Sequence, residues 1–177
     1  MKPILKRNCY ISKCKKYRWS LDLKISDQMK EIIFIGLNPS LSDSNFTDNT
    51  TKKIINISDN YNYGKIKIIN LFGLISKSPK SLLTHIDPVG FLNDVQIERS
   101  LQYWAENNYC DLWLGWGNHG NIYKRNEYLL EFLMKYHFIK KKRFKKVISP
   151  FLIKYTIMNH PIHPLYCSNK SKFIEYL

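Results

Sequence analysis

The sequence predicts an α/β protein in which helices cover both faces of a short, mostly parallel central sheet, a three-layer α/β/α sandwich. Two observations lead to this prediction. Apolar runs of strand length alternate with amphipathic segments of helix length, and no internal repeat or long linker interrupts them. The chain has 177 residues, 44% of them hydrophobic, which is enough to bury a core. We therefore expect one domain that spans residues 1–177.

Four apolar runs predict the strands of the sheet. The first is "EIIFIGL", residues 31–37, and the second is the isoleucine-rich "KIKIINLFGL", residues 65–74. The third is "CDLWLGWG", residues 110–117. The last strand is expected within residues 147–166, before a proline-rich loop. Runs of this length and composition are typical of buried strands.

Three segments between these runs predict helices. "TTKKIINISDN" begins at Thr50, and Asp48 or Asn49 is in place to cap it. In "DVQIERSLQYWAEN" and "NEYLLEFLMKYHF", apolar residues recur at the spacing of one helix face. The residues expected to face the core are Ile97, Leu101, Trp104 and Ala105 in the second helix, and Leu129, Leu130, Leu133 and Met134 in the third.

A polar or glycine-rich segment follows each predicted strand. In chain order these segments are "GLNPS", "NLFG", "GWGNHG" and "HPIHPLY". The carboxyl ends of parallel strands meet at one edge of a sheet, and ligands bind there. We therefore expect the four segments to build one site, with Asn38, Asn70, Trp116 and His163 in a common cleft.

The charge of the chain indicates a polyanionic partner. It carries 28 Lys and Arg against 14 Asp and Glu, a formal net charge of +14, and its densest basic block is "KKKRFKK", residues 140–146. Such a field attracts nucleic acid. The alternative is a lysine-rich surface that reflects an AT-rich genome. The candidates for contact with nucleic-acid phosphates are Arg18, Ser40, Arg125, Lys140, Lys141, Lys142 and Arg143.

The sequence indicates a cytoplasmic monomer without a membrane partner. No apolar stretch reaches the length of a membrane span, and the basic N-terminus lacks the apolar core of a signal peptide. The four cysteines, Cys9, Cys14, Cys110 and Cys167, lack the spacing of a metal knuckle. We expect ordinary thiols, with an iron–sulfur site as the alternative, and no metal or other cofactor.

The chain resembles a bacterial family of uncharacterised proteins, domain of unknown function 1643. The matching stretches are "CKKYRWSL", "FIGLNPSLSD", "TDNT", "NLFGL", "DPVGFLND", "WGNHG" and "HPLY", which cover most of residues 14–167. The four strand-end segments, in the same order, are also similar to the motif series of the uracil-DNA glycosylase superfamily. This second resemblance implies a uracil-DNA glycosylase-like fold and a DNA-binding enzyme that hydrolyses a base–deoxyribose bond without a cofactor.

The glycosylase resemblance implies roles for three residues. Asn38 takes the place of the residue that positions the attacking water, and Asn70 takes that of the asparagine that reads the base. His163 takes the place of the histidine that contacts the leaving base, with His160 as a weaker match. A reaction of this kind must place a water and stabilise an anionic leaving group.

Each of these residues also has a structural explanation. Asn38 can bond backbone groups in a tight turn, and His163 can be a turn histidine. Asp48 and Asp43 are candidate general bases, and Asp48 can instead cap a helix. Asn70 interrupts an apolar strand, where its amide can pair with a base edge or with a neighbouring loop.

Aromatic and polar side chains near the same segments are candidates for holding the base. Phe46 or Phe72 could stack on it, although phenylalanines more often belong to the core. Asn118 and His119 follow the third predicted strand, and His119 is as compatible with solvent as with a pocket. The base-binding candidates are Asn70, Phe46, Phe72, Trp116 and Asn118.

The leading hypothesis is therefore a DNA glycosylase-like hydrolase. One alternative is an enzyme that uses the same pocket on free nucleotides or nucleosides. The other is a non-catalytic nucleic-acid-binding module of the same fold, which is favoured by an asparagine at position 38, because an amide is a poor base.

Overall fold

The structure, a computed structural model, describes residues 2–40, 47–145 and 150–176. Within them one sheet contains the strands β1 (Lys6–Ile11), β2 (Arg18–Lys24), β3 (Glu31–Gly36), β4 (Lys65–Asn70), β5 (Cys110–Leu114), β6 (Phe151–Leu152) and β7 (Ile174–Glu175). The α-helices are α1 (Asn49–Asn60), α2 (Ser81–Thr84), α3 (Asn93–Glu106) and α4 (Arg125–Arg143). Two 3₁₀ segments, η1 (Asn118–Lys124) and η2 (Pro164–Tyr166), complete the described elements.

The sheet is mixed, which corrects the prediction of a short, mostly parallel sheet. Its strand order is β1-β2-β4-β3-β5-β6-β7. The pairs β4-β3, β3-β5 and β5-β6 are parallel, whereas β1-β2, β2-β4 and β6-β7 are antiparallel. The centre is parallel because α1 connects β3 to β4 and α3 connects β4 to β5. The hairpin β1-β2, which was not predicted, adds the antiparallel edge.

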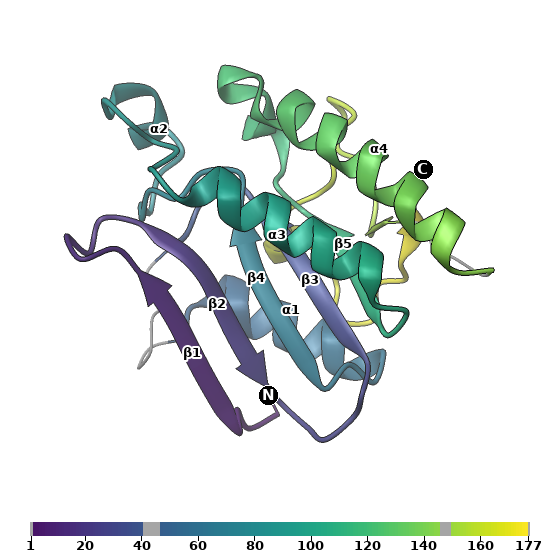
Figure 1. Cartoon of the computed structure of the whole chain (residues 1–177). Helices are drawn as coiled ribbons and strands as arrows, with labels where there is room; N and C mark the ends of the chain where they lie inside the picture. The colour runs from purple at the N-terminus through teal and green to yellow at the C-terminus, as the bar shows by residue number, and fades with distance from the viewer. Residues whose placement is uncertain (1, 41–46, 146–149, 177) are drawn as a thin grey trace.

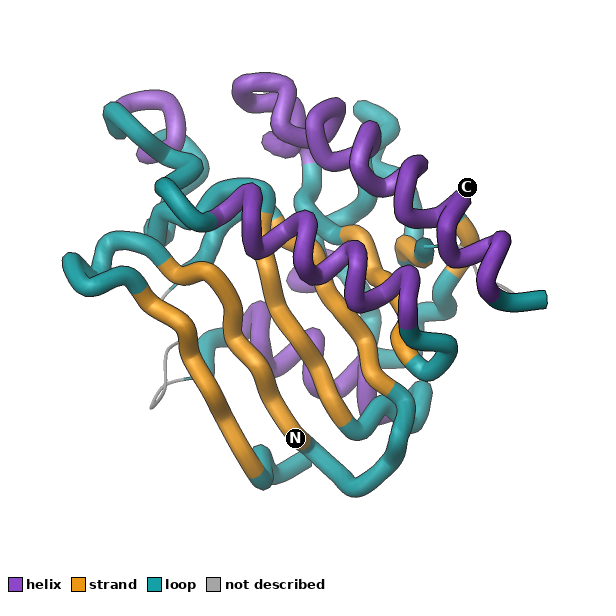
Figure 2. The backbone as a smooth tube through the Cα atoms, in the orientation of Figure 1, coloured by secondary structure: helices purple, strands orange, loops and turns teal. Residues whose placement is uncertain are grey.

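Helices lie on both faces of the sheet. In the view of Figure 1, α1 lies behind the sheet, whereas α3 and α4 lie in front of it, and Figure 2 shows the same layers. Side chains of β3 alternate between the two cores: Ile33 and Ile35 pack with the residues of α3 and α4, and Ile32 and Phe34 pack with those of α1. The general α/β class is confirmed. In the views of Figures 1 and 2, no helix formed by described residues lies in front of β1 and β2.

The central elements begin where the sequence predicts. The strands β3, β4 and β5 start at the expected residues, and α1 starts one residue before Thr50. The Asp48 carboxylate accepts a hydrogen bond from the backbone N–H of Thr51 at 2.7 Å, so Asp48 is the helix cap. The four residues of α3 expected in the core are all buried. The last predicted strand is reduced to the two residues of β6.

Helix α4 is longer than predicted and faces the core differently. Its buried stripe runs through Leu129, Leu133, Tyr136 and Lys140 at helical spacing, which turns Met134 outward, with 56% of its surface exposed. The expectation that Met134 faces the core is therefore wrong. No helix in the described part of the chain has both the length and the apolar character needed to cross a bilayer.

A β-bulge in β2 changes the face that Arg18 occupies. Tyr10 pairs with Ser20, but the next residue, Ile11, pairs with Arg18, so Trp19 is an extra residue in the strand. In a regular strand Arg18 and Ser20 would point to the same face. The extra residue breaks this alternation, and Arg18 lies on the α1 side, where Leu21 belongs to the core.

Candidate functional site

A pocket of about 470 Å³ lies at the carboxyl ends of the parallel strands, on the α1 side of the sheet. We call it the strand-end pocket. Each of the four strand-end segments contributes to it, because Asn38, Asn70, Trp116 and His163 all line it. This is the common site that the predicted strand ends indicated, although the sheet as a whole is mixed.

Asn70, the last residue of β4, presents a buried amide to the pocket. It is 3% exposed, and its Nδ2 atom has no hydrogen-bond partner among the described residues. Gly36 stands opposite it in β3, where an added Cβ would lie 2.9 Å from Asn70 Oδ1 and 2.9 Å from Phe34 Cε1. The backbone oxygen of Asn70 accepts a 3.1 Å bond from Asn93 Nδ2, which anchors the end of the strand to α3.

Asn38 is held by the segment that follows β4. Its Nδ2 atom donates to the backbone oxygens of Ser76 at 2.9 Å and Pro39 at 3.1 Å. The backbone N–H of Ser76 donates in turn to the oxygen of Pro39 at 2.9 Å. These bonds fix the amide plane, and no described residue donates to Oδ1 of Asn38. This oxygen is available to accept a hydrogen bond from a water or a ligand.

His163 precedes η2, and its ring is oriented by the turn. The Nδ1 atom accepts a 3.4 Å bond from the backbone N–H of Leu165, which assigns the proton of the neutral ring to Nε2. Burial lowers the pKa of His163 below its ordinary value, and the Asp48 carboxylate acts against this shift. A neutral His163 therefore offers one N–H donor.

Trp116 forms another buried part of the pocket wall. It is 2% exposed, and its Nε1 atom has no partner within the described chain. Its indole lies against Gly120, where a Cβ would come within 2.1 Å of the indole Cδ1 atom. Gly117 has a φ of +72° and donates to the oxygen of Pro161 at 2.8 Å, so the chain turns sharply beside the His163 segment.

Charged and polar residues complete the wall of the strand-end pocket around the four predicted residues. The Arg18 side chain is only 3% exposed and lines the pocket from β2, and the carboxylate of Asp48 lines it from the start of α1. Ser40, Asn118 and His119 line it as well. The pocket is also lined by three residues that were not predicted as site residues: Lys77, Leu165 and Tyr166. Leu165 and Tyr166 end the quoted segment "HPIHPLY", whereas Lys77 lies outside every quoted segment.

A family model described as "Protein of unknown function (DUF1643)" matches residues 18–165 of the chain. The chain belongs to this family. The match begins at Arg18 and ends at Leu165, both of which line the strand-end pocket. No curated protein and no solved structure matches the chain. The similarity to uracil-DNA glycosylases therefore stays a prediction.

Of the two phenylalanines proposed for base stacking in this DUF1643 member, Phe72 lies outside the pocket. Phe72 is fully buried in the core beneath α3 and α4, and its ring contacts Tyr123 edge-on. It does not line the pocket, because β4 ends at Asn70 and Phe72, beyond the strand, packs in the core on the other face of the sheet. Phe46 lies outside the described residues.

Two of the cations proposed for phosphate contact are structural. Arg125 is 6% exposed, donates from Nε to the oxygen of Leu71 at 3.0 Å and pairs with Asp94. Lys140 is 2% exposed, and its Nζ atom donates to the backbone oxygens of Trp104, Asn107 and Cys110. Both cations bind oxygens of distant chain segments, which satisfies them within the fold.

Lys141, Lys142 and Arg143 are exposed, but they lie far from the pocket. Their neighbour Lys140 binds Cys110, the first residue of β5, whereas the pocket residue Trp116 lies beyond the end of that strand. Five residues of strand span about 16 Å. These three exposed residues thus lie at the opposite edge of the sheet from the pocket, and their contact with phosphates stays a prediction.

The described residues offer no cluster for a metal ion. No group of three or more His, Cys, Asp or Glu side chains within the described ranges could hold one. Cys14 is exposed, Cys9 is half-buried, and Cys110 and Cys167 are buried. Burial raises the pKa of Cys110 to about 12, so this thiol stays protonated.

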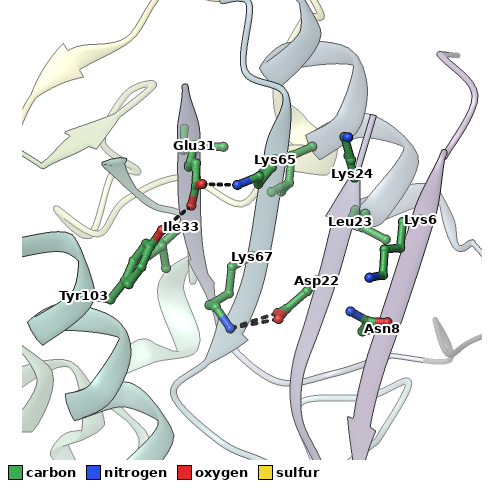
Figure 3. A pocket seen from close by; sticks show the side chains of 12 residues that line it. Lys6, Asn8, Asp22, Leu23, Lys24, Glu31, Ile33, Lys65, Lys67 and Tyr103 are labelled. Atoms are coloured by element: carbon green, nitrogen blue, oxygen red, sulfur yellow. Dashed lines mark hydrogen bonds and ion pairs between the residues drawn. The ribbon is translucent and has the colours of Figure 1, made fainter. Parts of the chain in front are cut away.

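A second pocket of about 400 Å³, the open-face pocket, lies on the sheet face that α3 and α4 leave uncovered (Figure 3). Lys65 pairs with Glu31 at 2.6 Å, Lys67 pairs with Asp22 at 3.0 Å, and Tyr103 donates to Glu31 at 2.8 Å. Glu31 and Lys65 begin their strands, so this pocket lies at the edge opposite the strand-end pocket. None of the predicted site residues is among its lining residues.

Proposed function

We propose that this member of the DUF1643 family binds a nucleobase in the strand-end pocket and hydrolyses its bond to deoxyribose in DNA. The observation that carries the proposal is a pair of buried donors, Asn70 Nδ2 and Trp116 Nε1, that have no partner among the described residues. Buried polar groups left without partners cost free energy, so a ligand that supplies acceptors would bind there. A nucleobase supplies acceptors along a flat edge.

The proposed fold assignment rests on the order of motifs. A uracil-DNA glycosylase-like sandwich would bring the same four strand ends together, and in this chain they line one pocket. The volume of about 470 Å³ lies in the range of small-molecule sites and accommodates a base with its sugar. The net charge of +14 supports a polyanionic substrate.

In the proposed reaction, the bond between C1′ and the base nitrogen breaks, and the electron pair leaves with the base. Water then adds to C1′, and one of its protons ends on the released base, so no cofactor is consumed. Asn38 Oδ1 would accept a hydrogen bond from this water, because bonds to Ser76 and Pro39 hold the amide in place. Such preorganisation lowers the cost of placing the nucleophile.

His163 would stabilise the departing base. Its neutral ring carries a proton on Nε2, and a donor of this kind can bond to the negative charge that develops on the base. The lowered pKa keeps the ring neutral near pH 7. Asp48 is the one carboxylate among the described residues that line the pocket, which makes it the candidate general base in addition to its cap role.

A second candidate is an enzyme for free nucleotides. The observation that favours it is the position of Arg18, a buried guanidinium in the pocket wall that could bind the phosphate of a mononucleotide. The exposed block of Lys141, Lys142 and Arg143 lies at the other edge of the sheet and lends no support to a long substrate.

The test is a panel of oligonucleotides that carry different natural, mismatched and modified bases, scored for abasic sites. Parallel reactions with the matching nucleosides and mononucleotides are scored for free base. Asn38→Ala protein, purified in the same way, controls for contaminating activity. Abasic sites that need the native chain support the proposal, and base release from monomers alone supports the second candidate. Binding of oligonucleotides without any release of base would identify a non-catalytic module.

A further inference from the structure

Five lysines lie on two segments next to the strand-end pocket: Lys13, Lys15 and Lys16 in the β1–β2 turn, and Lys77 and Lys80 after β4. We call them the basic rim. All five are exposed. Among the described residues, none of them has a carboxylate within the 4 Å of an ion pair. The segments "SKCKKYR" and "SKSPKS" contain no acidic residue.

Three of the four lysines that line the open-face pocket differ in this respect, whereas Lys6 has no ion pair among the described residues. Lys24 pairs with Asp27 at 2.6 Å, and Lys65 and Lys67 are paired with Glu31 and Asp22, as Figure 3 shows for the last two. A polyanion would have to displace these carboxylates to bind there. The five lysines of the basic rim have no ion-pair partner in the described part of the chain, so an anionic ligand would displace no described carboxylate there.

The basic rim is joined to the pocket through the backbone. The oxygen of Lys16 accepts a 2.9 Å bond from the N–H of Ile75, and the next residue, Ser76, holds the Asn38 amide. Two residues after Lys16, the bulge directs Arg18 into the pocket. Lys77 itself lines the pocket. Positive charge therefore begins at the pocket, with Lys77 and Arg18, and continues outward from it along the other rim lysines.

We propose that the basic rim holds the sugar–phosphate backbone of the DNA strand whose nucleotide enters the pocket, an inference that rests on the proposed function. Lys77 and Arg18 line the pocket and suffice for the phosphate of one nucleotide. Lys13, Lys15, Lys16 and Lys80 lie outside it, where only a longer ligand would reach them. This extension of charge beyond the pocket fits a polymer of phosphates.

The first test compares two triple variants that remove the same charge. One variant carries Lys13→Gln, Lys15→Gln and Lys16→Gln, and its matched control carries Lys141→Gln, Lys142→Gln and Arg143→Gln. Fluorescence anisotropy measures the affinity for a fluorescein-labelled oligonucleotide, single-stranded and duplex, over a range of salt concentrations. Each lost phosphate contact lowers the slope of log affinity against log salt by about 0.7 to 0.9.

We expect the rim variant to lose about two units of this slope and the control to lose less than half a unit. Equal losses in the two variants, or no binding of DNA by the native chain, would overturn the proposal. The binding measurement needs no catalysis. If the native chain releases no base but the two variants still differ in salt slope, the result contradicts the glycosylase function and leaves the proposed contact of the rim with DNA intact. If the native chain releases base but the rim variant keeps the native salt slope, the result contradicts the rim contact and leaves the glycosylase function intact.

The second test uses the thiol in the middle of the rim. Cys14 is exposed, and its pKa is lowered by a hydrogen bond from Ser12, 3.3 Å away, and by the backbone of Lys16. Iodoacetamide should therefore react with Cys14 before the buried thiols. We expect an oligonucleotide to slow this reaction several-fold and a mononucleotide to leave it unchanged. Equal rates with and without bound oligonucleotide would contradict a rim contact.

Discussion

Asn70 lies so close to Gly36 that no side chain fits between them: a Cβ on Gly36 would come within 2.9 Å of Asn70 Oδ1. The two residues are register partners on the parallel strands β3 and β4. The glycine thus sets the position of the amide whose nitrogen is left without a partner in the described structure. This relationship can be tested without changing any polar group.

Replacing Gly36 by alanine should displace Asn70 and Phe34, since the new methyl group meets both side chains. Small-to-large changes in packed sites cost about 1 to 3 kcal/mol of stability. Base release, or ligand affinity if the protein is not catalytic, should fall as far as it does in Asn70→Ala. The double variant should lose little more than either single one. Additive losses would show that Gly36 acts elsewhere.

Asn38→Ala and His163→Ala should each slow base release about a hundredfold, because each removes a preorganised group. Affinity for DNA should change little, as neither residue belongs to the basic rim. Single-turnover kinetics on the best substrate of the panel measures the rate. His160→Ala is the matched control, because this histidine lies in the same loop but does not line the pocket. Full activity in both variants would make Asn38 and His163 turn residues only.

The two roles of Asp48 can be separated by choice of substituent. Asparagine is as good a helix cap as aspartate, so Asp48→Asn should keep the stability of α1, whereas Asp48→Ala should cost about 1 kcal/mol. If Asp48 is the general base, both variants should lose about a hundredfold or more in rate. Denaturant unfolding and single-turnover kinetics together distinguish the roles. An active Asp48→Asn protein would leave only the cap.

The half-buried imidazole of His163 should make stability depend on pH. Its folded pKa is lowered, chiefly by burial, whereas in the unfolded chain it titrates at its ordinary value of about 6.5. This contribution is complete above pH 6.5 and is lost as the pH falls through the folded pKa, because the unfolded state takes up the proton first. Urea unfolding at several pH values between 5 and 7.5 measures the free energy of unfolding at each pH. We expect this free energy to change less with pH in His163→Gln than in the native chain.

Lys140 should matter for folding and not for ligand binding. Removing its ammonium group in Lys140→Met leaves three backbone oxygens without their donor, and we expect a loss of about 3 kcal/mol. The exposed neighbour Lys141 should tolerate the same substitution within about 0.5 kcal/mol. Thermal unfolding measures both. A Lys140→Met protein with native stability and weakened DNA affinity would restore the phosphate role.

The parts of the fold that could be predicted are those with local apolar periodicity. Leu101 and Trp104 at helical spacing identify α3, and the isoleucines of β3 and β4 identify buried strands. The hairpin β1-β2 was missed because one face of β1, with Lys6, Asn8 and Tyr10, remains exposed and carries little apolar signal. The two-residue strands β6 and β7 depend on pairing with distant segments, which no local pattern records.

The pocket could be located from the sequence because its residues directly follow strands, as Asn38, Asn70 and Trp116 do. The fate of the cations could not be predicted. The buried Lys140 donates to backbone oxygens of residues that lie 30 to 36 positions away along the chain. The local sequence around a basic run does not indicate such distant partners. The face of the sheet on which the Arg18 side chain lies depends on the β-bulge, because strict alternation along β2 would place it on the opposite face.

That bulge limits how the length of related chains can vary during evolution. Insertions or deletions in the turn at residues 12–17 shift no pairing of β2 with β4, but they would move the rim lysines and the Lys16 oxygen to which Ile75 donates. Loss of the single extra residue, Trp19, would return Arg18 to the opposite face of the sheet and remove its guanidinium from the strand-end pocket, which leaves Lys77 as the one Lys or Arg among the described lining residues. A related chain without the extra residue would then have to bind an anion in this pocket without a cation from β2.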